Sequence, residues 1–290
     1  MTCNVPGNYT LMLSVDDGVH AITRDAVVVR VTARDAVTNV STRVQTGAGE
    51  GVSIAGFIVV GDVEKKVVVR GLGPSLASAG VSGALADPTL ELYDSAGTTV
   101  ATNNNWKDTQ EQAIRDTNLA PADVLEAALV TTLAPGSYTA VMRGVNGTIG
   151  IGLVEVYDLE ESPQSKLGNI STRSFVGTAD SVMIGGAIIA GAEAAQILFR
   201  ALGPSLASAG INQPLADPEL ELFNAQGSRI AMNDNWKATQ QLAITGTGLA
   251  PANDFESAIL IDLNPGNYTA IVSGVNGATG VGSVEAYQLH

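Results

Sequence analysis

The chain has 290 residues, and 29 acidic against 15 basic side chains give it a net charge of -14. A negative charge of this size, with no basic cluster, argues against nucleic-acid binding and against docking on an anionic membrane. One cysteine and two histidines exclude a Ser-His-Asp triad, a Cys-His pair or a histidine-based zinc site in each half, so we expect no enzyme. The 32 glycines, with abundant Val, Ile, Thr and Ala, favour many short strands joined by tight turns.

The first segment, residues 8–34, predicts two strands around an Asp16-Asp17-Gly18 turn. Its Gly-x-Tyr strand, Asp-Gly turn and Val-rich return resemble the last two strands of a PKD or related immunoglobulin-like domain. The resemblance implies that residues 1–35 are the hairpin of an incomplete Ig-like domain. Either the chain is a fragment cut inside that domain, or the hairpin packs on the first repeat or is completed by a neighbouring subunit. The strand residues that would then join subunits are Tyr9, Leu11, Leu13, Val15, Val27, Val29 and Val31.

The rest of the chain is a tandem duplication. Residues 41–160 match residues 171–290 without a gap, and the segment 70–80 returns almost letter for letter as 200–210. A period of this length is that of a whole domain, so we expect two units that each bury their own core. The expected boundaries are 36–160 for repeat 1, 161–168 for a polar linker and 169–290 for repeat 2.

Each repeat predicts eight or so short strands and one short helix. In repeat 1 the expected hairpins are 52–60 with 66–70, 90–93 with 99–101, and 127–132 with 138–143, with a closing strand at 154–157 and a helix at 109–116. The fold class is therefore all-β: two tandem β-sandwich domains of jelly-roll type after an N-terminal hairpin. The apolar run 182–199 fits two buried strands better than a membrane span, because Glu193 and Gln196 interrupt it.

The matched motifs also resemble a known kind of repeat. The series Ile-Ser-Thr-Arg, Arg-x-Leu-Gly-Pro-Ser-Leu, Asn-x-Asn-Trp and Val-Glu-x-Tyr resembles a repeat of very large exported proteins of environmental bacteria. The second half of each repeat is similar to the pre-peptidase C-terminal type of sandwich. The resemblance implies an exported, multi-domain protein at the cell surface or outside the cell, and it implies no catalytic residues.

The Gly73-Pro74-Ser75 motif lacks the Gly-x-Ser-x-Gly frame of a nucleophile elbow, so we interpret it as a structural turn. Arg70 precedes this motif in a strand that should be largely buried. Its planar guanidinium can donate two hydrogen bonds to one carboxylate, so we expect a carboxylate partner. We expect that partner to be Glu91 or Asp87. The equivalent expectation in repeat 2 pairs Arg200 with Glu221 or Asp217.

Two motifs leave a ligand open. The Asn-rich turns, residues 103–105 and 233–235, offer oxygens of the kind that calcium binds. Asn and Asp are also common in turns because their side chains form hydrogen bonds with their own backbone. Trp106 and Trp236 would be sugar-stacking platforms if exposed and plugs of the core if buried. We expect no other cofactor. The candidate calcium ligands are Asp87, Asn103, Asn105, Asp217, Asn233, Asp234 and Asn235.

These observations predict a non-enzymatic structural or adhesive protein of the extracellular space or the cell surface. Its partners would be copies of itself, joined head to tail through the N-terminal strands into a filament, or neighbouring domains of a longer chain. The alternative is a carbohydrate-binding accessory module of a secreted hydrolase, with a polysaccharide as its ligand.

Overall fold

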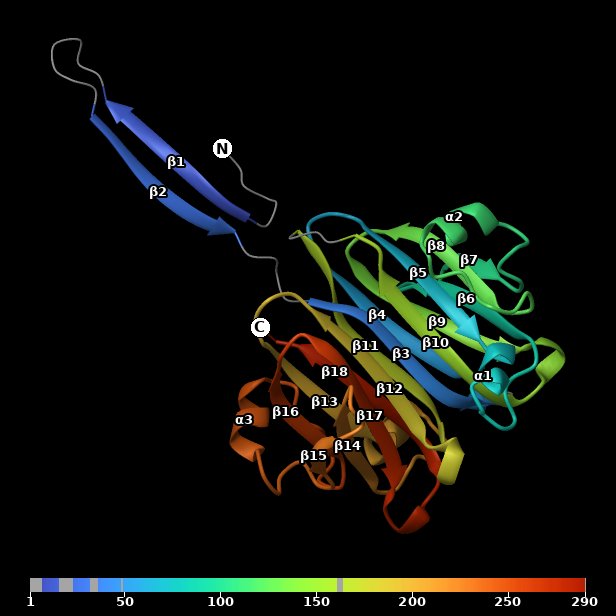
Figure 1. Cartoon of the computed structure of the whole chain (residues 1–290). Coiled ribbons are helices and arrows are strands. Elements are labelled where there is room, and N and C mark those ends of the chain that lie inside the picture. Colours follow the sequence, from blue (N-terminus) through green and yellow to red (C-terminus); the bar gives the residue numbers. More distant parts are fainter. Residues whose placement is uncertain (1–6, 16–22, 32–35, 48, 161–163, 290) are drawn as a thin grey trace.

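The computed structural model describes residues 7–15, 23–31, 36–47, 49–160 and 164–289 (Figure 1). Strands dominate these residues, which confirms the predicted all-β class. Strands β1 (Gly7–Val15) and β2 (Thr23–Val31) form the predicted hairpin, and within the described residues they pair only with each other. The PKD or Ig-like origin of this hairpin stays a prediction.

Each repeat contributes eight strands, as the sequence predicts. Repeat 1 contains β3 (Ala36–Thr46), β4 (Ser53–Gly61), β5 (Lys65–Leu72), β6 (Pro88–Asp94), β7 (Thr99–Asn103), β8 (Ala127–Leu133), β9 (Gly136–Gly144) and β10 (Gly150–Asp158). They pair as β3-β10-β5-β8 and β4-β9-β6-β7, all antiparallel, which is the strand order of a jelly roll.

Repeat 2 has the same order, β11-β18-β13-β16 and β12-β17-β14-β15. Its strands are β11 (Ser165–Val176), β12 (Met183–Ala190), β13 (Ala195–Leu202), β14 (Pro218–Asn224), β15 (Arg229–Asn233), β16 (Ser257–Leu263), β17 (Gly266–Gly274) and β18 (Gly280–Gln288).

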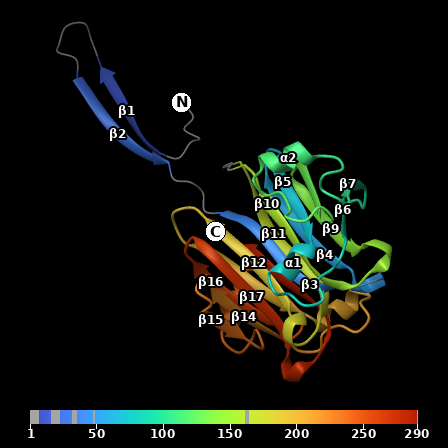
Figure 2. The same cartoon turned by 45° about the vertical axis from the view of Figure 1, so that its right-hand side comes forward.

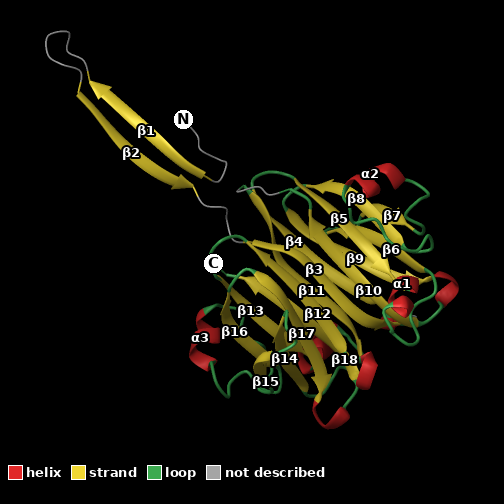
Figure 3. Cartoon of the chain, viewed as in Figure 1, coloured by secondary structure: helices red, strands yellow, loops and turns green. Residues whose placement is uncertain are grey.

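Helices are short and lie outside the sheets (Figure 3). Helix α2 lies within the predicted range 109–116, and its buried Ile114 packs with Trp106 on the outer face of β5 and β8. In the part of the chain that is described, no helix is long and apolar enough to cross a membrane. The helices are α1 (Pro74–Ser78), α2 (Glu111–Asp116) and α3 (Gln241–Gly246), with 3-10 turns η1 (Gly49–Gly51), η2 (Val145–Gly147), η3 (Ala179–Ser181), η4 (Pro204–Ala209) and η5 (Val275–Gly277).

The two repeats are fused edge to edge, which differs from the predicted pair of separate units. Strand β3 of repeat 1 pairs with β12 of repeat 2, and β11 of repeat 2 pairs with β4 of repeat 1. The pairs connect all sixteen strands of the two repeats, and apart from the two-point contact of β3 with β11 they divide into two eight-stranded sheets, each of which runs through both repeats. Figures 1 and 2 show this continuity. Sheet I is β8-β5-β10-β3-β12-β17-β14-β15, and sheet II is β16-β13-β18-β11-β4-β9-β6-β7.

The segment predicted as a linker is partly strand. Strand β11 begins at Ser165, inside the expected linker 161–168, and Ser165 pairs with Gly61 at the end of β4. The linker prediction placed this segment between two units, whereas the structure uses its second half to join them. The reason is that Ser165–Leu167 pair with Val59–Gly61 of β4 in the middle of sheet II.

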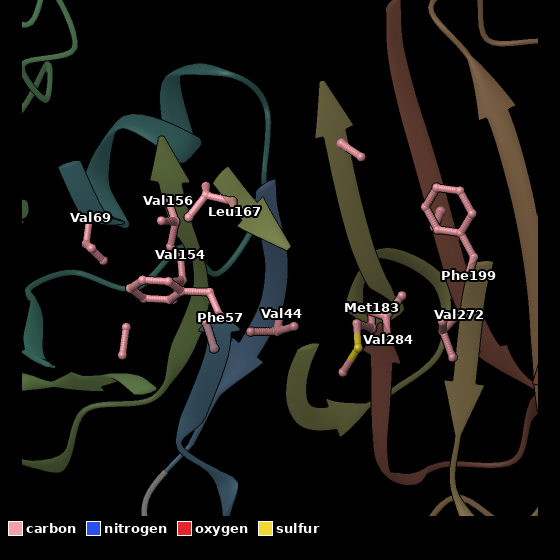
Figure 4. Close-up of a cluster of buried hydrophobic side chains, with 14 of the residues drawn as sticks. Val44, Phe57, Val69, Val154, Val156, Leu167, Met183, Phe199, Val272 and Val284 are labelled. Carbon is pink, nitrogen blue, oxygen red and sulfur yellow. The ribbon is translucent and has the colours of Figure 1, made fainter. Parts of the chain in front are cut away.

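The core lies between the two sheets. In β4 and β12 every second side chain is buried, as expected for strands with one face on a core. The largest cluster of buried apolar side chains draws on both repeats, with Phe57 and Val154 on one side of the junction and Phe199 and Val284 on the other (Figure 4). Two smaller clusters, around Trp106 and around Trp236, lie one in each repeat. The prediction that each repeat buries a separate core is therefore wrong.

Candidate functional site

Each repeat carries a buried carboxylate that holds the Gly-Pro-Ser turn. Glu126 is 0% exposed and accepts bonds from the backbone N–H groups of Gly73 and Ser75, both at 3.0 Å, and from the Ser75 hydroxyl. Its second oxygen accepts the N–H of Asp123 at 3.2 Å. Every donor of this nest is thus taken by a side chain of the same repeat. The turn is structural, as its motif indicates.

The same nest recurs in repeat 2. Glu256 is also 0% exposed and accepts from the N–H groups of Gly203 and Ser205 at 3.0 Å. The close approach of Gly203 to the backbone of Leu215 explains the glycine, because a Cβ at this position would lie 2.1 Å from the Leu215 carbonyl oxygen. The motif therefore recurs because of its packing.

The arginines before the turns do not bind the predicted carboxylates. Arg70 pairs with Glu155 of β10, and it donates a 2.7 Å bond to the carbonyl of Leu119. Arg200 makes the equivalent contacts with Glu285 and Leu249. The predicted partner Glu91 binds Arg143 instead. The prediction failed because neighbouring strands, rather than nearby sequence, bring Glu155 beside Arg70 in the β10–β5 register.

A tyrosine completes each arginine cluster. The Arg70 guanidinium lies 5.1 Å from the centre of the Tyr157 ring, and Arg200 lies 4.8 Å from that of Tyr287. Burial, followed by the charge of Glu155, raises the pKa of Tyr157 to about 12. Burial likewise raises the pKa of Tyr287. Both phenols therefore stay neutral at physiological pH, and the clusters serve to hold strands together.

Amide side chains close the outer edges of the sandwich. Gln110 donates to the carbonyl of Val130 and accepts its N–H, both at 2.9 Å, so one side chain imitates a neighbouring strand for β8. Asn103 accepts the N–H of Ala128 at 3.0 Å. Gln240 and Asn233 do the same for β16 in repeat 2. Such caps prevent an exposed edge from pairing with another chain.

The two tryptophans are core residues. Trp106 is 3% and Trp236 6% exposed, and their indole N–H groups donate to the carbonyls of Asp123 and Asn253. Lys107 and Lys237 lie 5.2 and 5.3 Å from the ring centres of Trp106 and Trp236. Neither ring offers a face to a sugar, so the stacking hypothesis for Trp106 and Trp236 is wrong and the packing interpretation holds.

The Asn-rich turns contain oxygens without a hydrogen-bond partner. Asp87 Oδ1 and Asn105 Oδ1 in repeat 1 are buried and unpaired, and so are Asp217 Oδ1 and Asp234 Oδ1 in repeat 2. These four atoms belong to predicted calcium ligands. By contrast, the amide groups of Asn103 and Asn233 are fully used, because each donates to the carbonyl of the residue two positions later as well as accepting a strand N–H.

Carbonyl oxygens converge near the same turn of repeat 2. The Ser257 hydroxyl lies 2.6, 2.9 and 2.8 Å from the carbonyl oxygens of Pro218, Asn233 and Asp234, although it has one proton to donate. Burial and the charge of Asp234 raise the pKa of Asp217, and burial raises that of Asp87. Uncompensated negative potential thus surrounds this turn. The remaining predicted ligand, Asn235, accepts hydrogen bonds at its backbone carbonyl from the Asn233 amide at 3.1 Å and from the Ala238 N–H at 2.9 Å.

The ligand set is sparse in carboxylates. Among the described residues, no group of three or more His, Cys, Asp or Glu side chains is placed to hold a metal ion. A cation at these turns would rely on carbonyl and amide oxygens beside one or two carboxylates, and hard cations such as calcium accept such mixed oxygen sets.

The predicted subunit-joining residues lie on the hairpin β1–β2. Tyr9 lies opposite Val29 and Leu11 opposite Val27, while Leu13 and Val15 continue β1 and Val31 ends β2. These residues occupy alternate positions of the paired strands.

Comparison with known proteins does not place the chain in a family. No family model matches it, and no curated protein matches it. Among solved structures, a DUF4785 family protein of Legionella pneumophila is 9% identical, with a TM-score of 0.27 over 99% of this chain and 82% of that one. A structure of Sulfolobus turreted icosahedral virus is 11% identical, with a TM-score of 0.23 over 86% and 90%.

A third structure is that of an M60 catalytic domain with two CBM51 domains from Clostridium perfringens. It is 7% identical, with a TM-score of 0.21 over 98% of this chain and 41% of that one. TM-scores this low support no inference about this chain, so its function is argued from its own residues.

Proposed function

We propose that this chain is a non-enzymatic structural segment of an extracellular or cell-surface protein, and that its fused jelly rolls act as one stiff spacer. The observation that carries the proposal is the continuity of both sheets through the two repeats. A hinge between the repeats would require breaking β3 from β12 and β11 from β4 at the same time. Units joined by a flexible linker would move freely at no such cost.

The polar clusters support the same role. The carboxylates of Glu126 and Glu155 and the guanidinium of Arg70 are all bound within their own repeat. Gln110 and Asn103 close an edge that could otherwise recruit other strands. These polar side chains therefore hold the fold together, which suits a module that transmits tension.

Mechanical unfolding of single molecules tests the proposal. Residues 36–289 extended to about 3.5 Å each would release roughly 890 Å of chain. We expect one event of about this length, because the shared sheets and core should fail together. Two events of about half the length each would show independent units and overturn the proposed spacer role.

Antibody labelling of intact cells of the producing organism tests the surface location. Labelling that appears only after the cells are lysed would contradict it.

We further propose that the hairpin β1–β2 joins successive chains into filaments through the apolar residues at its alternate positions. Negative-stain microscopy of the full chain should show fibres, and Leu11→Asp should abolish them, because it places a charge in the middle of that apolar series. Thr10→Asp, at the neighbouring polar position of the same strand, is the matched control and should leave the fibres intact. Discrete particles from the unaltered chain at every concentration would refute assembly.

The carbohydrate-binding alternative is not proposed, since the indole rings of Trp106 and Trp236 are both buried.

We also propose that the Asn-rich turns bind calcium, more tightly in repeat 2. The unpaired oxygens of Asp217 and Asp234 supply two carboxylates there, whereas Asp87 and Asn105 supply one. At 10 to 100 times the dissociation constant, calcium would stabilise the fold by about 1.4 to 2.7 kcal/mol. Thermal unfolding with calcium or with a chelator measures this gain. Equal stability in both, for the unaltered chain, would rule out the site.

A further inference from the structure

We propose that the junction edges of each repeat form an interaction surface for a second copy of this chain, so that two chains exchange repeats. In the exchanged dimer, repeat 1 of one chain would pair with repeat 2 of the other through the contacts that now join them within one chain. This inference rests on the fold alone and does not require the proposed spacer role.

The junction is self-complementary. Ile189 pairs with Val37, and Val59 pairs with Leu167, so the same two positions meet in both halves with the repeats interchanged. At the centre, β3 and β11 touch at two points, and the second of these joins Gln45 to Phe175, its equivalent position in repeat 2. Such an approximate two-fold arrangement is that of an isologous dimer interface, made here within one chain.

Buried polar contacts give the junction specificity. Thr42 and Thr172 are equivalent residues, each 1% exposed, and their hydroxyls lie 2.8 Å apart. The Ser174 hydroxyl donates to the carbonyl of Gln45 at 2.9 Å. A different strand docked on these edges would leave the hydroxyls buried without partners, which is costly in a dry core. A second copy of the chain satisfies all of them.

The junction edges also lack the side-chain caps that close the outer edges β8 and β16. Gln110 and Asn103 occupy the backbone groups of β8, but β3 and β4 have their edge groups bonded by strands of the other repeat. If the repeats separate, four strand edges open together. Open edges of this kind pair with whatever matching strand is nearest.

The length of the connector between the repeats determines whether a repeat pairs within its own chain or with a second chain. Six residues separate the end of β10 at Asp158 from the start of β11 at Ser165. This short tether gives the attached repeat a high effective concentration, so one chain closes on itself at low protein concentration. Inserting about 20 Gly and Ser residues should lower that effective concentration roughly ninefold, because it falls as the −3/2 power of length. The ratio of dimer to monomer should rise by the same factor.

Two single-cysteine chains, both carrying Cys3→Ser, test the exchange. One carries Thr42→Cys and the other Thr172→Cys, so neither can form a disulfide within its own monomer. Each is unfolded, mixed with the other, refolded at high concentration and oxidised. We expect a covalent dimer from the mixture and none from either chain alone, with a roughly ninefold larger yield for the longer connector.

Differently tagged copies of the unaltered chain, refolded together, provide the second measurement and do not depend on the cysteines. We expect each tag to retrieve the other copy, in an amount that rises with the concentration during refolding. Monomers alone, with native circular dichroism at every concentration, would overturn the proposal. Tag-linked dimers whose folded cysteine variants never cross-link would also overturn it, because the chains would then meet through a different surface.

Discussion

Replacing Glu126 by alanine should destabilise the whole fused unit. The carboxylate is fully buried and accepts four hydrogen bonds, from the N–H groups of Gly73, Ser75 and Asp123 and from the Ser75 hydroxyl. Bonds to a charged acceptor contribute about 1.5 to 3 kcal/mol each when measured singly, and buried donors left without a partner cost about 1 to 3 kcal/mol. Because water can enter the vacated space and serve some donors, we expect a loss of about 3 to 5 kcal/mol.

Urea unfolding of the full chain, followed by circular dichroism, measures the loss. Glu256→Ala removes the matching carboxylate of repeat 2, which accepts the same set of bonds, so it should cost a similar amount. Glu111→Ala is the control. Its ion pair with Arg115 is about half exposed, and it should cost less than about 0.5 kcal/mol.

Glu126→Gln separates charge from shape. The amide oxygen can still accept from Gly73 and Ser75, but the amide NH₂ would face the N–H of Asp123, so a cost of about 1 to 3 kcal/mol is expected. If Glu126→Ala lies within 1 kcal/mol of the unaltered chain, the carboxylate does not hold the turn and the reasoning fails.

Three further changes probe other parts of the structure. Asp217→Asn should raise the stability of the calcium-free chain at neutral pH and abolish any gain from calcium. The raised pKa of Asp217 favours its protonated form in the fold, so the stability advantage of the variant should vanish as the pH falls below the ordinary pKa of an aspartate. A difference in melting temperature that does not change with pH would refute this. Gln110→Ala should cost about 1 to 2 kcal/mol and increase light scattering by freeing the β8 edge, whereas unchanged scattering would deny it a protective role. Tyr157→Phe should remove a phenol that ionises near pH 12, as followed by ultraviolet absorbance, and stability should fall less steeply from pH 10 through 12 than in the unaltered chain, with Tyr287 accounting for part of the remaining fall; an unchanged slope would refute this.

Strand periodicity was enough to predict the strands, whereas helix α1 (Pro74–Ser78) lies where a turn and a loop were predicted. Alternation in β4 and the Asn-Gly turn at Asn146, which takes a positive φ of 56°, are local features that a short stretch of sequence determines. The helix at Glu111–Asp116 and the eight strands of each repeat also follow from local patterns. Local physics therefore accounts for the all-β class.

Partners far apart in the chain were harder to predict. Arg70 binds Glu155, 85 residues away, because β5 and β10 are neighbours in the sheet. Sequence proximity suggested Glu91 instead. The duplication held a usable signal, since Gln110, Glu126 and Glu155 each recur at the same place in repeat 2 as Gln240, Glu256 and Glu285. A polar residue kept in both copies within an apolar strand is a candidate for a buried contact.

The fusion of the repeats could not be predicted from periodicity. Both repeats carry the same strand edges, and periodicity does not say whether an edge pairs within its own repeat or with the other repeat. Jelly-roll topology resolves the choice. Strands β3 and β4 follow one another in the chain but belong to different sheets, so one repeat alone leaves both edges open on the same side of its sandwich. A second copy turned by two-fold rotation presents β12 to β3 and β11 to β4, and it closes both edges in one step. Duplication within one chain thus removes the exposed edges that a single repeat would carry, and it does so with strands that the sequence already contains.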